Sequence, residues 1–547
     1  MIRTKNILCL LLMTAIIISA TACGNATLPA SSQAANSTAS SSVGVTSGSA
    51  DVLAAQSGSF PIVKEPIEIT AMGLVSPQGG DHNDTYCWTE YEKMTNIKIT
   101  WENIPTDAKD ERISVALASN QLPDMLYGLG IKGVDVAKYG GYGTFMPLED
   151  LIDQYGYHFQ RVMEEYPEIR KGITMPDGHI YSLPHVKTGP LMKNNMLFIN
   201  PIWLENVHME TPTNLDEYTE VLRAFRDQDA NGNGDPTDEV PLAFRTGHLI
   251  QTMQTFFGLG TRGVRHKYVD VDPEGTLRFM PTSPQYKDMV TYLNMLYNEK
   301  LLDNEVFTMS SSRDIVAKLT QDIVGSHADY SSNAGPKMQE IYRVLPLMDN
   351  FYGEKTWTRT EPTVATLGAF LLSSSTKYAP ELMKWIDYFY SEDGQIMYNL
   401  GIEGVTFEVT PEGEYQYTEL FTNNPDGLTV TQVRTKYMGF QAAAGIQSDK
   451  YYKSGETHWT SQEGLPHYQD YIGESIWPEF PMDPDEVEEF GALISDIGAY
   501  SDEGFAGFVT GKKPISEWDS YVAEFDKLNV DRLLEIYENI SSRYEAM

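Results

Sequence analysis

Basic residues, cysteines and long apolar runs are all scarce in this chain of 547 residues. Lys and Arg total 40 against 76 Asp and Glu, which gives a formal net charge of −36. A surface this acidic repels nucleic acids and anionic lipids, so neither is expected as a partner. After the first 23 residues, no apolar run is long enough to cross a bilayer. The sequence therefore points away from nucleic-acid-binding proteins and from proteins with membrane-spanning helices.

The first 22 residues read as a secretory leader. Arg3 and Lys5 precede an apolar stretch over residues 7–20, and residues 20–23 are Ala-Thr-Ala-Cys. This end resembles the bacterial lipobox, with Ala20 where Leu is usual, and it implies a lipoprotein signal peptide (residues 1–22) with acylation of Cys23. The alternative is an ordinary cleaved leader with an incidental cysteine. Loss of Arg3 and Lys5 with the leader changes the formal charge from −36 to −38.

Residues 23–60 are expected to form a lipidated tether. The segment is rich in Ser, Thr and Ala, and from residue 24 to residue 59 it has one charge, Asp51, and no aromatic residue. It has too little apolar surface to offset the entropy of ordering, and as a flexible coil it would span about 30–35 Å. Of the three cysteines, only Cys87 then lies in the folded body, so no intramolecular disulfide is possible there. A buried Cys87 is the simpler interpretation than a nucleophile.

The body, from about residue 61, shows alternating strand and helix patterns. Strands are predicted at residues 67–72, 97–101 and 125–127, and helices at 85–94 and 111–119. This β-α-β-α-β order predicts an open, largely parallel sheet covered by helices, with ligands binding beyond the carboxyl ends of the strands. Further predictions are a tight turn at residues 176–178, a strand-like segment at 322–328 and amphipathic helices at 381–390 and 530–544.

A series of short segments resembles the extracellular solute-binding proteins, family 1, which feed carbohydrate ABC importers in Gram-positive bacteria. The matching segments are residues 117–124 (LASNQLPD), 176–184 (PDGHIYSLP), 198–200 (FIN), 203–204 (WL), 212–213 (PT), 215–218 (LDEY), 399–405 (NLGIEGV) and 518–522 (WDSYV). In order, they cover most of residues 65–545.

The resemblance implies an α/β, two-lobed, type II periplasmic-binding-protein-like fold. Each lobe would be a mixed, mostly parallel sheet flanked by helices, with an oligosaccharide bound in the cleft between the lobes. One lobe is expected to comprise residues 61–185 plus 320–362, and the other residues 186–319 plus 363–547. Closure around the ligand is expected to present the protein to ABC transporter permease subunits. The family implies a monomer on the extracellular face of the cell membrane, held there only by its lipid.

Residues 227–239 (DQDANGNGDPTDE) predict a calcium site. Ca²⁺ takes six to eight oxygen ligands, and acidic or amide side chains alternating on a tight loop supply them. The expected ligands, at EF-hand-like positions, are Asp227, Asp229, Asn231, Asn233 through its backbone carbonyl, Asp238 and Glu239. The family resemblance implies a structural ion in this loop. The alternative is a solvated acidic turn without metal.

Sugar binding needs flat apolar surfaces and planar polar groups. The candidate ligand-binding residues are Gln78, Asp81, Asn83, Tyr86, Trp88, Tyr127, Asp329, Tyr330, Trp357, Arg359, Glu403 and Trp459, with Trp477 as an alternative to Trp459. Tryptophans in a protein of this size are often core residues, so packing is the competing interpretation for each of them.

Enzymatic interpretations find little support in the motifs. Residues 258–263 (GLGTRG) match the dinucleotide-binding glycine pattern, but they lead into a strand-like segment, residues 264–271, and not into a helix. A lipid-anchored glycoside hydrolase stays an alternative, because it needs only two carboxylates about 5–9.5 Å apart. A binding protein for another solute, such as a peptide, also stays open. A structural or adhesive surface protein would lack the βα alternation.

Overall fold

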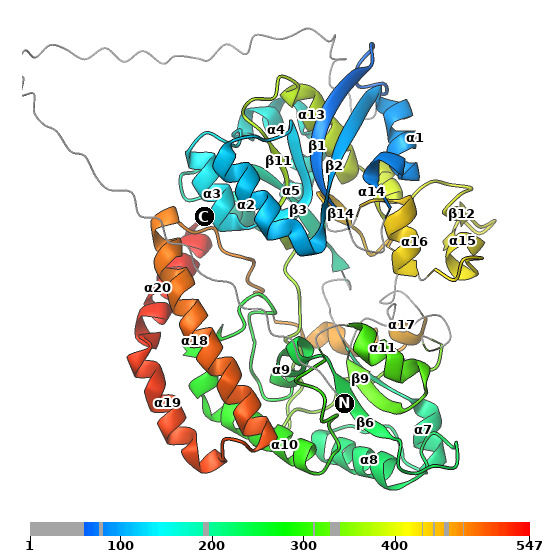
Figure 1. The fold of residues 1–547 in the computed structure, drawn as a ribbon, viewed down its shortest axis with the longest axis vertical. Coiled ribbons are helices and arrows are strands. Elements are labelled where there is room, and N and C mark those ends of the chain that lie inside the picture. Colours follow the sequence, from blue (N-terminus) through cyan, green and yellow to red (C-terminus); the bar gives the residue numbers. More distant parts are fainter. Residues whose placement is uncertain are drawn as a thin grey trace, which may run out of the picture. The chain divides into compact units, whose positions relative to one another are not determined.

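The computed structural model describes residues 59–75, 80–189, 196–309, 312–328, 338, 340–428, 430–440, 443–452, 459–473 and 475–547 (Figure 1). The predicted leader, Cys23, most of the tether, Gln78, Asp329 and Tyr330 lie outside the described residues. Within the described part of the chain, none of the helices combines the length and the apolar character that spanning a bilayer requires.

The predicted β-α-β-α-β unit is confirmed. Its elements are β1 (Ile67–Val75), α1 (Tyr86–Thr95), β2 (Ile97–Pro105), α2 (Lys109–Ser119) and β3 (Met125–Ile131). Both β2 and β3 pair in parallel with β1. β1 runs three residues past its predicted end at Met72, and β3 runs four residues past its predicted end at Tyr127. The loops that follow them therefore start later in the chain than expected.

Three more strands complete a six-stranded sheet in the order β14-β4-β11-β3-β1-β2. β11 (Val364–Leu372) is antiparallel to both β3 and β4 (Ser182–Lys187), and β14 (Gly445–Gln447) is parallel to β4. The carboxylate of Asp124 fastens the central strands, because it accepts bonds from Thr70 N at 2.9 Å and from Thr376 Oγ1 at 2.8 Å. We call this sheet and its helices the first lobe.

The second lobe is built on a four-stranded sheet in the order β10-β5-β9-β6. Its strands are β5 (Leu197–Ile199), β6 (Val240–Phe244), β9 (Val324–Ala328) and β10 (Arg343–Val344). The pairs β10·β5 and β5·β9 are antiparallel, and only β9·β6 is parallel. The prediction of a mostly parallel sheet is therefore wrong for the described strands of this lobe.

The strand pairing also differs from the predicted lobe boundaries. We expected residues 320–362 in the first lobe, but β9 and β10 pair within the second. We expected residues 363–547 in the second lobe, but β11 and β14 pair within the first. The apolar run of β11 is buried between β3 and β4, and nothing local in such a run identifies the sheet that it joins. The chain passes from one lobe to the other between residues 187 and 197, again between residues 344 and 364, and again between residues 447 and 459.

Helices flank each sheet. In the first lobe these are α1, α2, α3 (Gly133–Gly141), α4 (Glu149–Tyr155), α5 (Tyr157–Glu165), α6 (Glu168–Ile173), α13 (Ala379–Asp387), α14 (Glu392–Leu400), α15 (Glu419–Thr422) and α16 (Val430–Tyr437). In the second they are α7 (Pro201–Asn206), α8 (Leu215–Asp227), α9 (Thr246–Thr255), α10 (Pro284–Asn298), α11 (Ser312–Thr320), α17 (Trp459–Gln462), α18 (Pro484–Thr510), α19 (Trp518–Lys527) and α20 (Val530–Ala546).

Short elements complete the described chain. They are two hairpins, β7 (Val269–Val271) with β8 (Leu277–Phe279) and β12 (Phe407–Val409) with β13 (Tyr415–Tyr417), and the 3-10 helices η1 (His82–Asp84), η2 (Thr106–Ala108), η4 (Met280–Thr282), η6 (Tyr388–Tyr390), η8 (Leu465–Tyr471) and η9 (Ile515–Glu517). The predicted turn at residues 176–178 is present, closed by the Gly178 N–H donating to Met175 O at 2.8 Å. The predicted helix at 381–390 is α13 followed by η6, and the one at 530–544 is α20.

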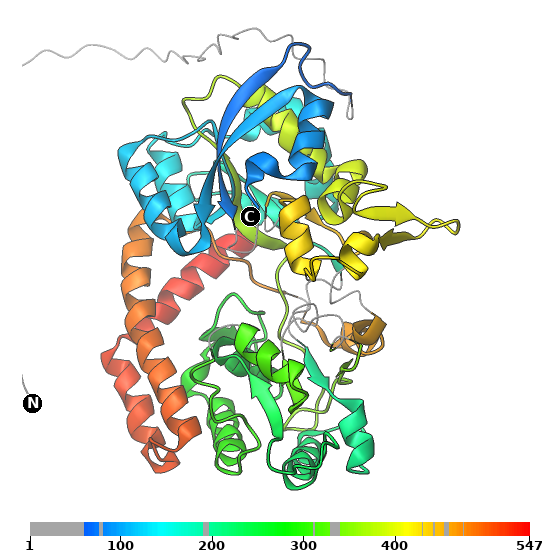
Figure 2. The ribbon, with the colours of Figure 1, turned by 45° about the vertical axis from the view of Figure 1, so that its right-hand side comes forward.

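Each sheet has its own hydrophobic core. The first-lobe core contains Leu126, Phe370 and Trp385, and the second-lobe core contains Phe198, Leu242 and Leu293. In both views of the ribbon, α18 and α20 run side by side (Figures 1 and 2), and α18 also packs on α10. The C-terminal helices therefore extend the second-lobe core.

Candidate ligand site and calcium loop

The segment that follows β1 presents two of the predicted ligand residues at the surface. Asp81 caps η1, and its Oδ1 accepts the Asn83 N–H at 2.8 Å and the Asn103 amide at 2.5 Å. The bond from the Asn83 N–H holds the pKa of the Asp81 carboxyl below its ordinary value. Asp81 is thus an exposed, ionised acceptor in a fixed orientation at the carboxyl end of β1.

The side chain of the neighbouring Asn83 bonds the backbone of β2. Its Oδ1 accepts the Trp101 N–H at 2.9 Å, and its Nδ2 donates to Trp101 O at 3.1 Å. Both ends of the amide are used in tying η1 to the backbone of β2. Tyr86, which begins α1, is half-buried.

Two predicted aromatic ligand residues of the first lobe are core residues in this structure. Trp88 is 6% exposed and Tyr127 is 1% exposed. The Trp88 ring stacks on Trp385 at 5.4 Å between centroids and meets Tyr127 edge-on, also at 5.4 Å. Tyr127 is buried because β3 continues to Ile131, which places this residue within the strand and not after it. Neither ring presents a surface to a ligand here.

The predicted residues near the chain crossing are also enclosed. Trp357 is 1% exposed, and its ring packs edge-on against Tyr468 at 4.7 Å. Arg359 is 2% exposed and donates to His248 O at 3.2 Å and Thr252 Oγ1 at 3.1 Å. Trp477, the alternative to Trp459, is 2% exposed. These buried residues therefore pack in the interior, near the segment that links β10 to β11.

Two predicted residues are exposed. Glu403 lies in the turn where the Gly404 N–H donates to Phe407 O at 2.7 Å. Trp459 begins α17 in the second lobe and is 46% exposed. Its indole N–H donates to Glu340 at 2.9 Å, and the Arg343 guanidinium lies 4.1 Å from the ring centroid. Trp459 is therefore an exposed indole held in one orientation, which suits stacking on a sugar ring.

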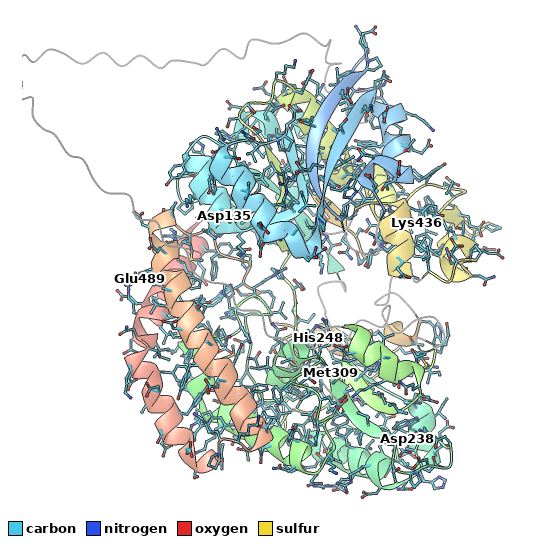
Figure 3. All side chains as sticks on the ribbon, viewed as in Figure 1. Asp135, Asp238, His248, Met309, Lys436 and Glu489 are labelled. Carbon is cyan, nitrogen blue, oxygen red and sulfur yellow. The ribbon has the colours of Figure 1, made fainter. Side chains whose placement is uncertain are left out.

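One polar cluster was not predicted from the sequence. Arg245 and His248 lie where β6 ends and α9 begins, and Figure 3 labels His248. Arg245 contacts the His248 ring, and burial, with Arg359 and Arg245 nearby, lowers the pKa of His248 to about 3. The buried strand of β6 followed by Arg-Thr-Gly-His was the available signal, because ligands gather at the carboxyl ends of parallel strands.

The predicted calcium loop follows α8 as a compact set of oxygen atoms. Asp229 Oδ2 accepts the Gly234 N–H at 2.9 Å, and Glu239 Oε1 accepts the Ala230 N–H at 3.0 Å. Both Asn231 and Asn233 donate side-chain N–H groups to Asp238, at 3.1 Å and 2.8 Å. Figure 3 labels Asp238 beside α7 and α8. The carboxylates of the loop thus accept hydrogen bonds from N–H groups of the loop itself.

The donor set fits a hard cation. Asp229 Oδ1 and Glu239 Oε2 are buried and accept no hydrogen bond, and buried carboxylate oxygens without partners are costly unless a cation faces them. Asp227 is committed elsewhere, because Arg226 bonds both of its oxygens, at 2.6 Å and 2.8 Å. This pairing lowers the pKa of Asp227. Among the described residues, no three His, Cys, Asp or Glu side chains converge as a ready-made metal site.

The glycine-rich residues 258–263 have an internal partner. The Gly260 N–H donates to Asp270 Oδ2 at 2.8 Å, and Arg278 binds the same carboxylate through Nε and Nη2, at 2.8 Å and 2.6 Å. Arg278 also donates to Gly258 O at 2.9 Å. The amide of the loop thus points at a carboxylate of the chain itself, and β7, not a helix, follows, so this is no dinucleotide site.

Comparisons with known proteins agree on one family. The family model for bacterial extracellular solute-binding proteins matches residues 83–396. The fructooligosaccharide ABC transporter substrate-binding protein FusA of Streptococcus pneumoniae serotype 4 is 26% identical over 491 residues, which are 87% of this chain and 90% of FusA.

Solved structures of FusA are similar over their whole length. The complex of FusA with kestose has a TM-score of 0.75 and 26% identity, covering 88% of this chain and 100% of that chain. An EF-hand mutant of FusA in complex with fructo-nystose has a TM-score of 0.75 and 25% identity, with the same coverage. The similarity confirms the predicted two-lobed, type II binding-protein fold.

Proposed function

This chain belongs to the bacterial extracellular solute-binding proteins, and we propose that it captures an oligosaccharide between its lobes and delivers it to an ABC transporter permease. The observation that carries the proposal is the similarity to FusA over nearly the full length of both chains. The fold supports it, since two lobes joined by crossing segments can close on a ligand. The proposed action is binding without cleavage, in line with the relatives, which are transporter binding proteins.

We propose that the sugar meets surface side chains of both lobes. From the first lobe these are Asp81, Tyr86 and Glu403, and from the second lobe Trp459. The carboxylates would accept hydroxyl hydrogen bonds, and the oriented indole would stack on a sugar ring. Gln78, Asp329 and Tyr330 stay predictions for the same site. We assign Trp88, Tyr127, Trp357 and Arg359 to packing, because each is at most 6% exposed.

We also propose that the loop at residues 227–239 holds a structural Ca²⁺. Asp229, Asn231, Asp238 and Glu239 would provide side-chain oxygens, Asn233 a carbonyl, and Asp227 a further carboxylate in exchange with Arg226. The ion would neutralise a loop dense in carboxylates and fix it against α8. An EF-hand mutant of FusA exists among the similar structures, which supports a related loop there.

The remaining part of the proposal concerns the N-terminus. Acylation of Cys23 would anchor the protein on the extracellular face of the membrane, and residues 24–59 would act as a flexible tether. Mass spectrometry of the membrane-extracted protein tests this. A mature N-terminus at Cys23 with a diacylglycerol mass supports the anchor, and an unmodified N-terminus elsewhere contradicts it.

Thermal unfolding of the body, residues 59–547, across a saccharide library tests the function. Kestose, longer fructooligosaccharides, and other neutral and uronate-containing oligosaccharides are added with calcium and with EDTA, and chromatography follows any cleavage. A ligand that binds the folded state alone stabilises it by about 2.7 kcal/mol at one hundred times its dissociation constant. A shift with intact sugar supports the proposal. Cleavage would favour the glycoside hydrolase, and no shift with any saccharide would leave peptides and other solutes to be tested.

A further inference from the structure

The glycine-rich loop of the second lobe, which the proposed sugar site does not use, lies against one segment that links the lobes and against a second segment that runs beside it. One segment, residues 357–363, joins β10 of the second lobe to β11 of the first. The other, residues 471–473 and 475–478, lies between η8 and α18 and runs beside the first, with the Trp357 N–H donating to Tyr471 O at 2.9 Å. We call residues 258–265 the hinge loop and these two stretches the hinge segments.

The hinge loop bonds the backbone of both hinge segments. The Val264 N–H donates to Thr360 O at 3.1 Å, and the Trp477 N–H donates to Arg262 O at 3.0 Å. The loop itself is fixed to the second lobe by the carboxylate of Asp270, which is 1% exposed and paired with Arg278. A rigid part of the second lobe thus holds both the linking segment, residues 357–363, and the segment beside it.

Gly263 makes this approach possible. Its φ is +86°, a conformation that side chains with a Cβ rarely adopt. A Cβ at this position would lie 2.6 Å from Thr360 O in one hinge segment and 2.7 Å from Ile476 Cγ2 in the other. The third glycine of the motif is therefore explained by close packing between the hinge segments.

Arg265, at the end of the hinge loop, reaches the first lobe. Its Nη2 donates to Glu361 Oε2 at 2.7 Å and to the carbonyl oxygen of Ala365. Ala365 belongs to β11, which lies between β3 and β4 in the middle of the first-lobe sheet. Glu361 is 12% and Arg265 34% exposed, so the pair is partly shielded from water. A charge-assisted bond therefore joins the second lobe to the central strand of the first across the hinge.

We propose that Arg265 is a positioning residue for solute capture. By bonding Ala365 and Glu361 from the hinge loop, it sets the balance between lobe arrangements, and so the fraction of molecules ready to bind. Apparent affinity scales with that fraction, so a residue that touches no ligand can tune it. The inference rests on the proposed function, because it assumes that binding follows lobe closure.

The test compares three hinge variants with a matched control. Arg265→Gln removes the charge and shortens the reach, Arg265→Lys retains the charge, and Glu361→Gln removes the acidic partner but leaves Ala365. The control is Arg532→Gln on α20, where an exposed Arg pairs with Glu489 and Glu535. Each protein is examined by small-angle X-ray scattering without ligand and by titration with the saccharide found in the library, beginning with kestose.

We expect Arg265→Gln to change the ligand-free radius of gyration and to change the apparent Kd by about fivefold or more, whereas Arg532→Gln stays within about twofold. Arg265→Lys and Glu361→Gln should fall between, with a wild-type melting profile. A wild-type scattering curve for Arg265→Gln, with or without an affinity change, would overturn the proposal. If wild-type protein binds no saccharide, the proposed function fails, and the ligand-free scattering still decides the hinge role.

Discussion

Asp387, the last residue of α13, accepts the backbone N–H of Phe159 at 2.8 Å at the start of α5. The other carboxylate oxygen accepts the N–H of His158 at 3.1 Å. The side chain is 5% exposed, and burial raises the pKa of Asp387 to about 7, against the two backbone bonds that lower it. One carboxyl group thus joins two helices of the first lobe.

The raised pKa of Asp387 implies that its contribution to the free energy of unfolding depends on pH. Because the folded pKa of Asp387 lies above its unfolded value, its contribution is full below about pH 4 and is lost as the pH rises through about 7. Asp387→Asn should lack this pH dependence. The free energy of unfolding of the variant, relative to that of wild type, should therefore rise by on the order of 1 kcal/mol per pH unit between about pH 4 and about pH 7. Urea unfolding from pH 4 to pH 8 measures it. Asp531→Asn, an exposed carboxylate on α20, should follow the wild-type curve, and a variant curve parallel to wild type for Asp387→Asn would disprove the assignment.

The calcium loop predicts metal-dependent stability. EDTA should lower the melting temperature of wild-type protein, and Ca²⁺ should restore it, because an ion held by the folded loop alone would stabilise the folded state. Asp229→Asn should abolish most of this calcium response by removing a buried carboxylate oxygen. Asp272→Asn, in the β7–β8 hairpin, where Asp272 accepts the Thr276 N–H at 2.8 Å, is the matched control and should respond like wild type. If EDTA leaves the wild-type transition unchanged, the loop is a solvated turn.

Asn83 is expected to matter for stability and not for specificity. Removal of its amide in Asn83→Ala breaks both bonds to Trp101 and should cost about 1–3 kcal/mol of unfolding free energy. Asn298→Ala, an exposed amide on α10 that bonds Asn294, should cost less than about 0.5 kcal/mol. Denaturant titration compares the two. A selective loss of sugar affinity with wild-type stability in Asn83→Ala would instead assign the side chain to the ligand.

The proposed stacking of Trp459 on the sugar predicts that its removal lowers the affinity for saccharide. Trp459→Ala should weaken saccharide binding by about threefold to tenfold through loss of one stacking surface. Tyr142→Ala removes an aromatic ring that is 73% exposed at the end of α3 and should leave affinity unchanged. Calorimetric titration with the saccharide from the library measures both. Equal affinities for Trp459→Ala and wild type would remove this residue from the proposed site.

Much of the local structure was predictable because its causes are local. The β-α-β-α-β unit of the first lobe follows from short-range periodicity, and its elements agree with prediction to within about four residues at each end. The oxygen-rich loop at residues 227–239 follows from composition and spacing alone. The ligand-facing side chains were harder. Trp88 and Tyr127 have the right chemistry, but their burial depends on Trp385, which lies far along the chain.

The family, the αβ alternation, the acidic character and the position of the oxygen-rich loop at residues 227–239 could be read from the local sequence. The three-dimensional structure was needed to show which segments after residue 319 join which lobe, which aromatic rings are buried, and which groups the glycine-rich loop bonds. The physical reason is strand pairing over long separations: Leu197 pairs with Ala328, and Met125 with Leu372. Such pairings depend on the whole set of strands competing for partners, and no window of local sequence contains that information.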